Sequence, residues 1–217
     1  MRRRIFMTIA GTVLTAFCIA LFRKISWGVD PFSCLIEGFE SSFGISYGLL
    51  MTIILGILLT FTFIMDRHYI GLATFITLFL QGAMVDFLEN QVLNRYLPAP
   101  DTAQKMIMML LALFSLCFGA SLYITSDLGV SAYDAVSLIM TEKTGWKYRV
   151  CRLLTDAFCT AVGVILHGNV GVITVVTASC MGSVVSWMNV HWAEQIRYGK
   201  LCRKDGNKIR KGADART

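Results

Sequence analysis

The second half of this 217-residue chain repeats the first. Glycines, threonines and a tyrosine of residues 28–88 recur further along, at a shift of 101 positions that becomes 100 after one deletion. A period this long is no solenoid repeat. It predicts a duplicated half-protein, and in an apolar chain such duplication is typical of membrane transport folds. The matched pairs are Gly28/Gly129, Gly44/Gly145, Tyr47/Tyr148, Gly71/Gly171, Thr74/Thr174, Thr77/Thr177, Gly82/Gly182 and Val85/Val185.

The composition places the chain in a membrane. Hydrophobic residues make up 55% of the sequence and charged residues 16%, whereas a soluble domain carries about 25% charged residues. Six apolar segments have the roughly 20 residues needed to cross a hydrocarbon core. Because backbone groups find no water in lipid, we expect these segments to be helices. They cover residues 5–24, 46–65, 69–89, 106–126, 147–167 and 170–190.

Each half also contains one shorter segment, at residues 31–43 and 132–144. At about 1.5 Å per residue, such a helix reaches only about 20 Å and cannot span. It is predicted either to lie on the membrane surface as an amphipathic helix or to enter the membrane as a re-entrant one. The first begins with an N-cap candidate, Asp30, followed by Pro31. The second begins with a pattern resembling a capping box.

The basic residues predict the orientation. With a cytoplasmic N-terminus, 16 of the 20 Lys and Arg residues lie inside, as the positive-inside rule requires. Both termini are then cytoplasmic, and three spans per half make the two repeats inverted. The predicted fold is therefore all-α, with six transmembrane helices in two inverted three-helix repeats. The parts are a first repeat 1–89, an external linker 90–105, a second repeat 106–190 and a basic cytoplasmic tail 191–217.

The tail holds 8 of the 20 basic residues, between Arg197 and Arg216. We interpret it as a solvated tail beside anionic lipid headgroups, with no specific nucleic acid partner. The expected partners are the lipid bilayer and an unknown small solute or ion, and a homo-oligomer is left open. No paired-ligand spacing of Cys or His and no nucleophile–base pattern occurs in the sequence. We therefore expect no metal, no cofactor and no enzymatic activity.

The fifth predicted span carries the most costly side chains. Arg149, Arg152 and Asp156 share one helical face, and Thr160 lies one turn further on. A charge at this depth costs at least about 2.5–3.5 kcal/mol on insertion scales. Arg152 and Asp156 are spaced for an i,i+4 ion pair. Two interpretations stay open: contact with a solute or ion, and a structural pair that holds the halves together.

The starts of the two short helices are a second candidate site. Their unpaired N–H groups and positive dipole ends would face a cavity if the helices are re-entrant. Asp30, Ser33, Ser131 and Asp134 lie there, and the acidic side chains suit a proton, a cation or a zwitterion better than a simple anion. The alternative is that these residues only cap the helices.

Other polar and small residues receive structural interpretations. The repeated small residues are expected to mark close helix packing rather than a ligand site. Glu37 and Glu40 on the first short helix are expected to be solvated, and Asp86 with Glu89 to reach the membrane interface. The predicted packing residues are Gly71, Thr74, Gly82, Gly171, Thr174 and Gly182.

Several short motifs occur in a characteristic order. They are Gly28-Val-Asp-Pro-Phe-Ser33, Gly44-Ile-Ser-Tyr-Gly48, Ile70-Gly-Leu-Ala-Thr74, Gln81-Gly-Ala-Met-Val-Asp86, Leu128-Gly-Val-Ser-Ala-Tyr-Asp134 and Tyr148-Arg-Val-Cys-Arg152. Through them the chain resembles the YczE-like (YczE/YyaS/YitT) bacterial membrane proteins over residues 5–190. That family usually has Pro where Ala132 stands and often Asp where Ser33 stands. The resemblance implies a multi-pass protein of the bacterial cytoplasmic (inner) membrane and supplies no catalytic residues.

Two functions are therefore expected. The leading one is a small secondary carrier that binds a solute or ion between the repeats. The alternative is a membrane accessory protein that assembles with or regulates other membrane components, in which the charged face is an intramembrane lock.

Overall fold

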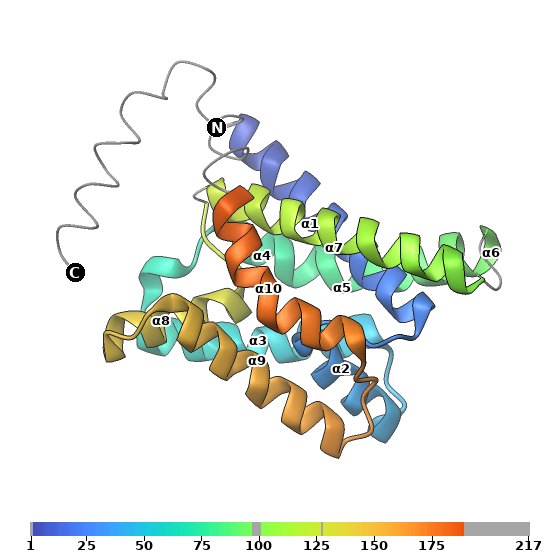
Figure 1. The fold of residues 1–217 in the computed structure, drawn as a ribbon. Coiled ribbons are helices and arrows are strands. Elements are labelled where there is room, and N and C mark those ends of the chain that lie inside the picture. The colour runs from blue at the N-terminus through green and yellow to red at the C-terminus, as the bar shows by residue number, and fades with distance from the viewer. Residues whose placement is uncertain (1, 97–100, 127, 189–217) are drawn as a thin grey trace.

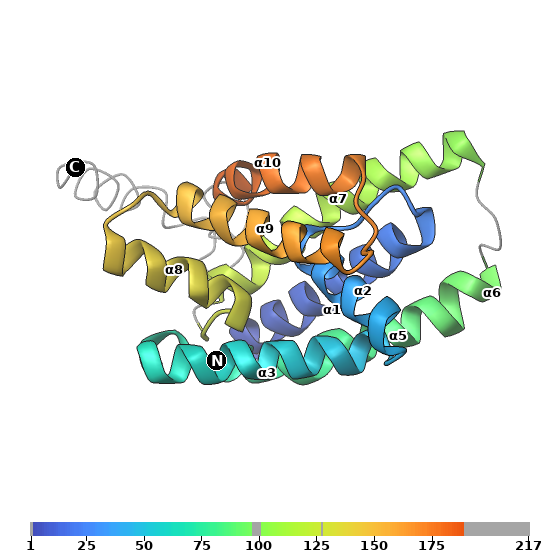
Figure 2. The same ribbon diagram turned by 90° about the horizontal axis from the view of Figure 1, so that it is seen from below.

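All regular structure in the described residues is helical. The computed structural model describes residues 2–96, 101–126 and 128–188. The elements, drawn in Figures 1 and 2, are α1 (Arg2–Ile25), α2 (Pro31–Phe43), α3 (Tyr47–Met65), a short turn of 3₁₀ helix (Arg67–Tyr69), α4 (Leu72–Ile76), α5 (Gly82–Phe87), α6 (Asn94–Tyr96), α7 (Thr102–Thr125), α8 (Ala132–Thr144), α9 (Tyr148–Ile165) and α10 (Val172–Met188).

The helix that contains α4, α5 and α6 changes its winding along its length. Two π-helical segments, Thr77–Gln81 and Leu88–Leu93, separate the three α-helical parts. A π-helical segment widens the helix locally and turns the side chains that follow it, and such segments are frequent at functional sites. The first of the two brings Gln81 to the cavity described below.

Four helices are long and apolar enough to cross a membrane: Arg3–Ile25, Tyr47–Met65, Leu72–Leu93 and Thr102–Thr125. They correspond to four of the six predicted spans. α9 falls outside this group because it carries three charged residues within 18 positions, and α10 has only 17 described residues. The all-α class is confirmed, and the six-span count stays a prediction at α9 and α10.

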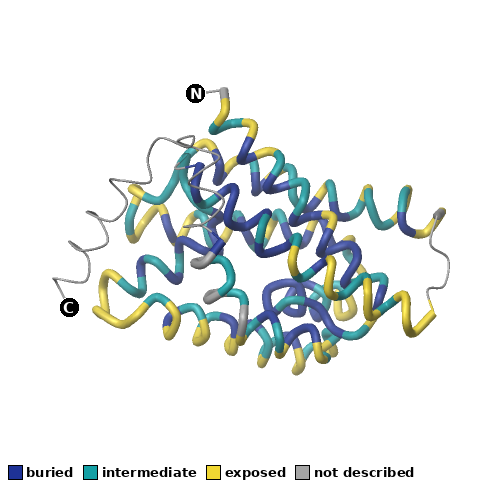
Figure 3. The backbone as a smooth tube through the Cα atoms, turned by 45° about the horizontal axis from the view of Figure 1, so that its top comes forward, coloured by how far each residue is buried: buried dark blue, intermediate teal, exposed yellow. Residues whose placement is uncertain are grey.

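The outer surface of the bundle is apolar, and the polar side chains are turned inward. Exposed residues lie along the outside of the long helices and buried ones along their facing sides (Figure 3). Phe6, Ile64 and Ile165 are each more than 70% exposed, while Thr8, Thr12 and Ser121 are fully buried. A surface this apolar matches contact with lipid rather than with water.

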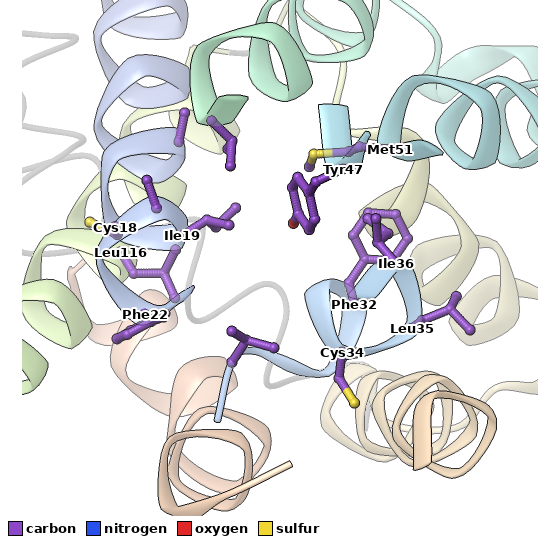
Figure 4. Close-up of a cluster of buried hydrophobic side chains, with 14 of the residues drawn as sticks. Cys18, Ile19, Phe22, Phe32, Cys34, Leu35, Ile36, Tyr47, Met51 and Leu116 are labelled. Atoms are coloured by element: carbon purple, nitrogen blue, oxygen red, sulfur yellow. The ribbon is translucent and has the colours of Figure 1, made fainter. Parts of the chain in front are cut away.

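The main hydrophobic core joins both halves of the chain. α1 contributes Cys18, Ile19 and Phe22, and α2 and α3 contribute Phe32 and Tyr47 (Figure 4). Leu116 of α7 and Ile173 of α10 belong to the same cluster. The core therefore lies between the repeated segments.

α1 and α7, the equivalent first helices of the two halves, pack against each other in opposite directions (Figure 1). The Thr8 hydroxyl donates to the Ser126 hydroxyl at 2.9 Å. One to two turns further along α1, Gly11 and Thr15 meet Gly119, which precedes Ser126 on α7. Small residues and hydroxyl bonds at a crossing are the means by which helices associate in lipid.

Further contacts also link each half to the other. α2 packs on α9, and α8 packs on α3. The Thr74 hydroxyl donates to the Val130 carbonyl at 2.7 Å, and the Thr174 hydroxyl donates to the Val29 carbonyl at 2.6 Å. The start of α4 thus contacts the segment before α8, and the start of α10 contacts the segment before α2.

Glycine is required at both of these crossings. Gly28 and Gly129 have φ values of +97° and +100°, which side-chain-bearing residues rarely adopt. A Cβ at Gly71 would lie 2.0 Å from the Leu128 carbonyl oxygen, and one at Gly171 would lie 2.1 Å from the Trp27 carbonyl oxygen.

The structure also places the remaining packing residues. A Cβ at Gly82 would lie 2.5 Å from the Gly48 carbonyl oxygen, so α5 and α3 approach closely there. The packing predicted at Gly182 lies outside what the structure describes. The same holds for the basic tail, 191–217.

The starts of the two short helices differ. At α2, the Asp30 carboxylate accepts the Ser33 N–H at 3.1 Å, as an N-cap does. At α8, Ser131 makes no side-chain capping bond. The predicted capping box is therefore wrong, because the carboxylate of Asp134 is bonded to side chains of α7 and α9 instead.

The crossings yield a test of the packing. Gly71→Ala and Gly171→Ala should each destabilise the protein by about 1–3 kcal/mol or more, since the added methyl has no room against a carbonyl group. Gly56→Ala is the matched control, because nothing lies within 4 Å of its Cβ; in mid-helix it should be neutral or stabilising by up to about 1 kcal/mol. Thermal unfolding in detergent measures all three, and equal stability of the three variants would contradict the packing.

Candidate functional site

A cavity lies between the starts of the two short helices and the long helices around them. Seventeen residues line it, and fourteen of these are seven pairs related by the sequence repeat. Both halves therefore present the same positions to the cavity. The pairs are Thr15/Leu116, Ile19/Ala120, Asp30/Ser131, Phe32/Tyr133, Met51/Arg152, Leu55/Asp156 and Gln81/Met181.

The two walls differ in chemistry although their positions are equivalent. Where the first half places Met51 and Leu55 of α3, the second half places Arg152 and Asp156 of α9. The wall from the first half is thus mostly apolar, and the wall from the second half is charged. Such a cavity has distinct sides for an apolar and a polar part of a ligand.

Arg152 is the centre of a buried network. Its guanidinium bonds to the Asp134 carboxylate, and its Nε lies 3.3 Å from Asp156 Oδ1. The hydroxyls of Tyr123 and Tyr133 donate to Asp134 and Asp156, respectively. The guanidinium carbon also lies 4.5 Å from the centroid of the Tyr133 ring. Each charged group is therefore satisfied by at least two partners, which a buried ion pair needs in order to be stable.

Asp30 is held differently. Its Oδ2 accepts the Ser33 N–H, whereas its Oδ1 is buried and has no hydrogen-bond partner within the described residues. Burial raises the pKa of Asp30, and the bonds with Ser33 and the charge of Arg152 act against that rise. Asp30 thus lines the cavity, and one of its carboxyl oxygens has no hydrogen-bond partner within the described residues.

A second cavity adjoins the first. It extends between α7, α8, α9 and α10 toward Tyr148, at the start of α9. Tyr123, Asp134 and Arg152 line both cavities. The Arg152–Asp134 ion pair therefore lies where the two cavities meet.

The structure gathers five of the eight predicted site residues at the first cavity: Asp30, Ser131, Asp134, Arg152 and Asp156. The other three line neither cavity. Arg149 is exposed. The Thr160 hydroxyl donates to the Asp156 carbonyl in its own helix, and the buried Ser33 hydroxyl lies 2.7 Å from the Tyr47 hydroxyl.

Among the lining residues that escaped the sequence reasoning are Tyr123, Tyr133 and Gln81. The repeat carried a signal for one of them, since Tyr133 aligns with Phe32 and directly precedes Asp134. These two rings stack at a centroid distance of 4.5 Å. Tyr123 and Gln81 lie in largely apolar helices, and only the folded structure shows what they face.

Metal ligation finds no support in the described part of the chain. No group of three His, Cys, Asp or Glu residues there could hold a metal ion. The described cysteines are free and buried: Cys18, Cys34, Cys117, Cys151 and Cys159.

A second charged cluster surrounds Arg23, near the end of α1. The guanidinium lies 3.2 Å from Glu37, 2.8 Å from Glu40 and 2.7 Å from Glu89. It also lies 4.3 Å from the ring centroid of Tyr47. The expectation that Glu37 and Glu40 are solvated is wrong, because their side chains are only 14% and 32% exposed. This cluster ties α1 and α2 to the end of the α4–α6 helix.

The surroundings of one carboxyl group in this cluster, that of Glu37, shift its pKa. Burial raises the pKa of Glu37 to about 7, against the lowering effect of Arg23 and with a further rise from Glu40. Asp86 accepts the Gly48 N–H at 3.0 Å, and its reach to the membrane interface stays a prediction.

The helical fold, the apolar surface and the charged internal cavity together define a multi-pass membrane protein. Residues 2–190 match the model of a family of unknown function, DUF6198, and the chain belongs to that family. It is 25% identical to the membrane protein YczE of Bacillus subtilis (strain 168), over 81% of this chain and 80% of the relative. It is also 25% identical to YyaS of the same organism, over 81% of this chain and 86% of the relative.

These relatives confirm the YczE-like resemblance inferred from the short motifs. No solved structure matches the chain.

The network predicts an order of destabilisation. Arg152→Gln leaves two buried carboxylates together without their cation and should cost about 3–5 kcal/mol. Asp134→Asn or Asp156→Asn leaves Arg152 with one carboxylate and should cost less, about 1–3 kcal/mol. Lys147→Gln, at the exposed residue before α9, is the control and should change stability by less than about 0.5 kcal/mol. Thermal unfolding in detergent would contradict the network if Arg152→Gln were the mildest cavity variant.

The Arg23 cluster predicts a pH dependence. Because the pKa of Glu37 is about 7 in the folded state against an ordinary 4.5, the folded state binds more protons between these values. Stability present in acid should therefore fall as pH rises toward about 7 and then level off. Glu37→Gln should flatten this decline, while Glu40→Gln, which keeps Glu37, should retain it. Unfolding midpoints from about pH 5 to about pH 8 are the measurement, and a decline unchanged in Glu37→Gln would refute the assignment.

Proposed function

We propose that this protein is a small secondary carrier with six spans in two inverted repeats, which binds a solute or ion in the cavity between them. The observation that carries the proposal is the lining of the cavity by seven repeat-related pairs of residues. Carriers built from inverted repeats bind their substrate at the interface of the repeats, and a rocking of one repeat against the other alternates access.

The contacts between the halves support an inverted arrangement. α1 and α7 run antiparallel, and each short helix packs on the second long helix of the other half. Hydrogen bonds from Thr74 and Thr174 cross between the halves at equivalent places. A two-fold axis in the membrane plane would relate such contacts pairwise.

α9 and α10 are the remaining two spans in this proposal. Asp156 and Cys159 of α9 are buried, while Leu153 and Phe158 are 52% and 68% exposed. This division gives α9 a lipid-facing side, and its inner charges are placed against the cavity as intramembrane charges usually are. α2 and α8 are then the short non-spanning helices whose starts meet at the binding site.

The proposed location is the bacterial cytoplasmic membrane, with both termini in the cytoplasm. The asymmetry of Lys and Arg residues supports this orientation. The second cavity, which extends toward Tyr148, then opens on the cytoplasmic side. The tail at 191–217 would lie beside anionic lipid headgroups.

One observation favours the accessory function as a second candidate. Arg152 already has two carboxylate partners, so the network is complete without a ligand. A satisfied network of this kind can hold α7, α8 and α9 in one arrangement. In that case the protein would act by binding other membrane components rather than by moving a solute.

Transport in proteoliposomes separates the two functions. Vesicles that contain the purified protein should accumulate a member of one solute class (cation, zwitterion or anion) when a proton or sodium gradient is imposed. Ala120→Leu, which adds bulk where both cavities are lined, should lower the uptake rate by about tenfold or more. Ala103→Leu, at an exposed position of α7, is the control.

The opposite result is equally clear. The carrier function is wrong if two results are found together. No solute class accumulates in the proteoliposomes beyond its level in protein-free vesicles, and in cells the Ala120→Leu variant behaves as the unchanged protein does.

A further inference from the structure

Asp30 is the carboxylate of the cavity that forms no ion pair with Arg152. Three carboxylates line the cavity, Asp30, Asp134 and Asp156, against the guanidinium of Arg152. Asp134 and Asp156 both contact Arg152, and each accepts a tyrosine hydroxyl. Asp30 Oδ1 is buried without a hydrogen-bond partner within the described residues. Since a buried charge without a partner is costly, this oxygen favours a positively charged or hydrogen-donating ligand.

The sign of the cavity charge excludes an anion. With its carboxylates ionised, the cavity holds three negative groups and one positive group. Arg152 has two carboxylates against it already, so it offers no open side to an anionic ligand. Coulomb attraction in a low-dielectric site therefore selects a positive charge.

The remaining lining distinguishes between kinds of cation. A metal ion prefers several oxygen ligands, and within the described part of the chain no three His, Cys, Asp or Glu residues are placed so that they could hold one. The cavity instead presents an aromatic ring, Phe32, and the apolar side chains of Ile19, Met51 and Leu55. A carboxylate beside an aromatic and apolar wall suits an organic ammonium group, which binds through charge, cation–π contact and its carbon atoms.

We propose that the cavity binds a small organic ammonium ion, with its charged nitrogen at Asp30 Oδ1 and its carbon atoms against Phe32, Met51 and Leu55. This inference names the solute class of the carrier proposed above and rests on that proposal. The opposite wall is formed by Asp134, Arg152 and Asp156. Because these side chains already bond to one another, only Asp30 is left to bind a charged group of the ligand.

Binding is tested on the purified full-length protein in detergent, apart from transport. Methylammonium, tetramethylammonium and choline chloride are titrated at about pH 8, which favours the ionised carboxylate, with NaCl and KCl at the same ionic strength as comparison. At ten times its dissociation constant, a bound ammonium should raise the unfolding midpoint by about 3–6 °C. NaCl and KCl should raise it less.

The test residue has a matched control. Asp30→Asn keeps the N-cap, because Asn caps as well as Asp does, and should weaken ammonium binding by about 10- to 100-fold. Asp101→Asn makes the same change at the exposed N-cap of α7 and should leave binding as it was. Equal stabilisation of the Asp30→Asn variant, or stabilisation by NaCl and KCl alone, would overturn the ammonium site.

Transport separates this failure from a failure of the carrier function. If the protein takes up an anion or a zwitterion and Asp30→Asn does not slow this uptake, the carrier function is supported and the ammonium site is wrong. If ammonium binding depends on Asp30 but no uptake is measured, the ammonium site is supported and the carrier function is wrong.

Discussion

The structure depends on how a positive charge is accommodated among apolar helices. Arg152 lies in a helix whose outer side is exposed and apolar, and it is satisfied only because side chains from α7, α8 and its own helix surround it. A guanidinium in such surroundings is stable when its carboxylate partners are themselves hydrogen-bonded. The network therefore fixes the position of α8 relative to α9, and with it one wall of the cavity.

Sequence reasoning predicted the fold class and named five residues that line the cavity, but it did not predict which side chains bond to one another. The apolar segments and the repeat are properties of the sequence itself, so the helices and the meeting of the two short-helix starts could be predicted. The Arg152–Asp156 pair could be predicted because both residues lie on one helix. Asp134, the other carboxylate on Arg152, comes from another helix, and Arg23 gathers Glu37, Glu40 and Glu89 from two further helices. No local pattern encodes such contacts.

The same limit explains the errors. Ser131 and Asp134 have the spacing of a capping box, and a capping bond is the best local use of that carboxylate. Tertiary contact offered Asp134 a guanidinium and a hydroxyl, which are stronger partners than a backbone N–H group. Glu37 was expected to be solvated for the same reason, since Arg23 lies in a different helix. In lipid, a distant charged partner outweighs a local polar one.

The two repeats place equivalent positions around the cavity, but the side chains at these positions differ in charge and polarity between the repeats. Equivalent positions line the cavity from both halves, yet they hold Met51 and Leu55 in one half and Arg152 and Asp156 in the other. A symmetric lining would place two guanidinium groups or none in one small space, and two buried like charges repel strongly. Confining the guanidinium to one half avoids that repulsion and leaves Met51 and Leu55 of the other half as an apolar part of the lining. The repeated backbone thus permits a cavity between the halves, and the unequal side chains determine what the cavity can hold.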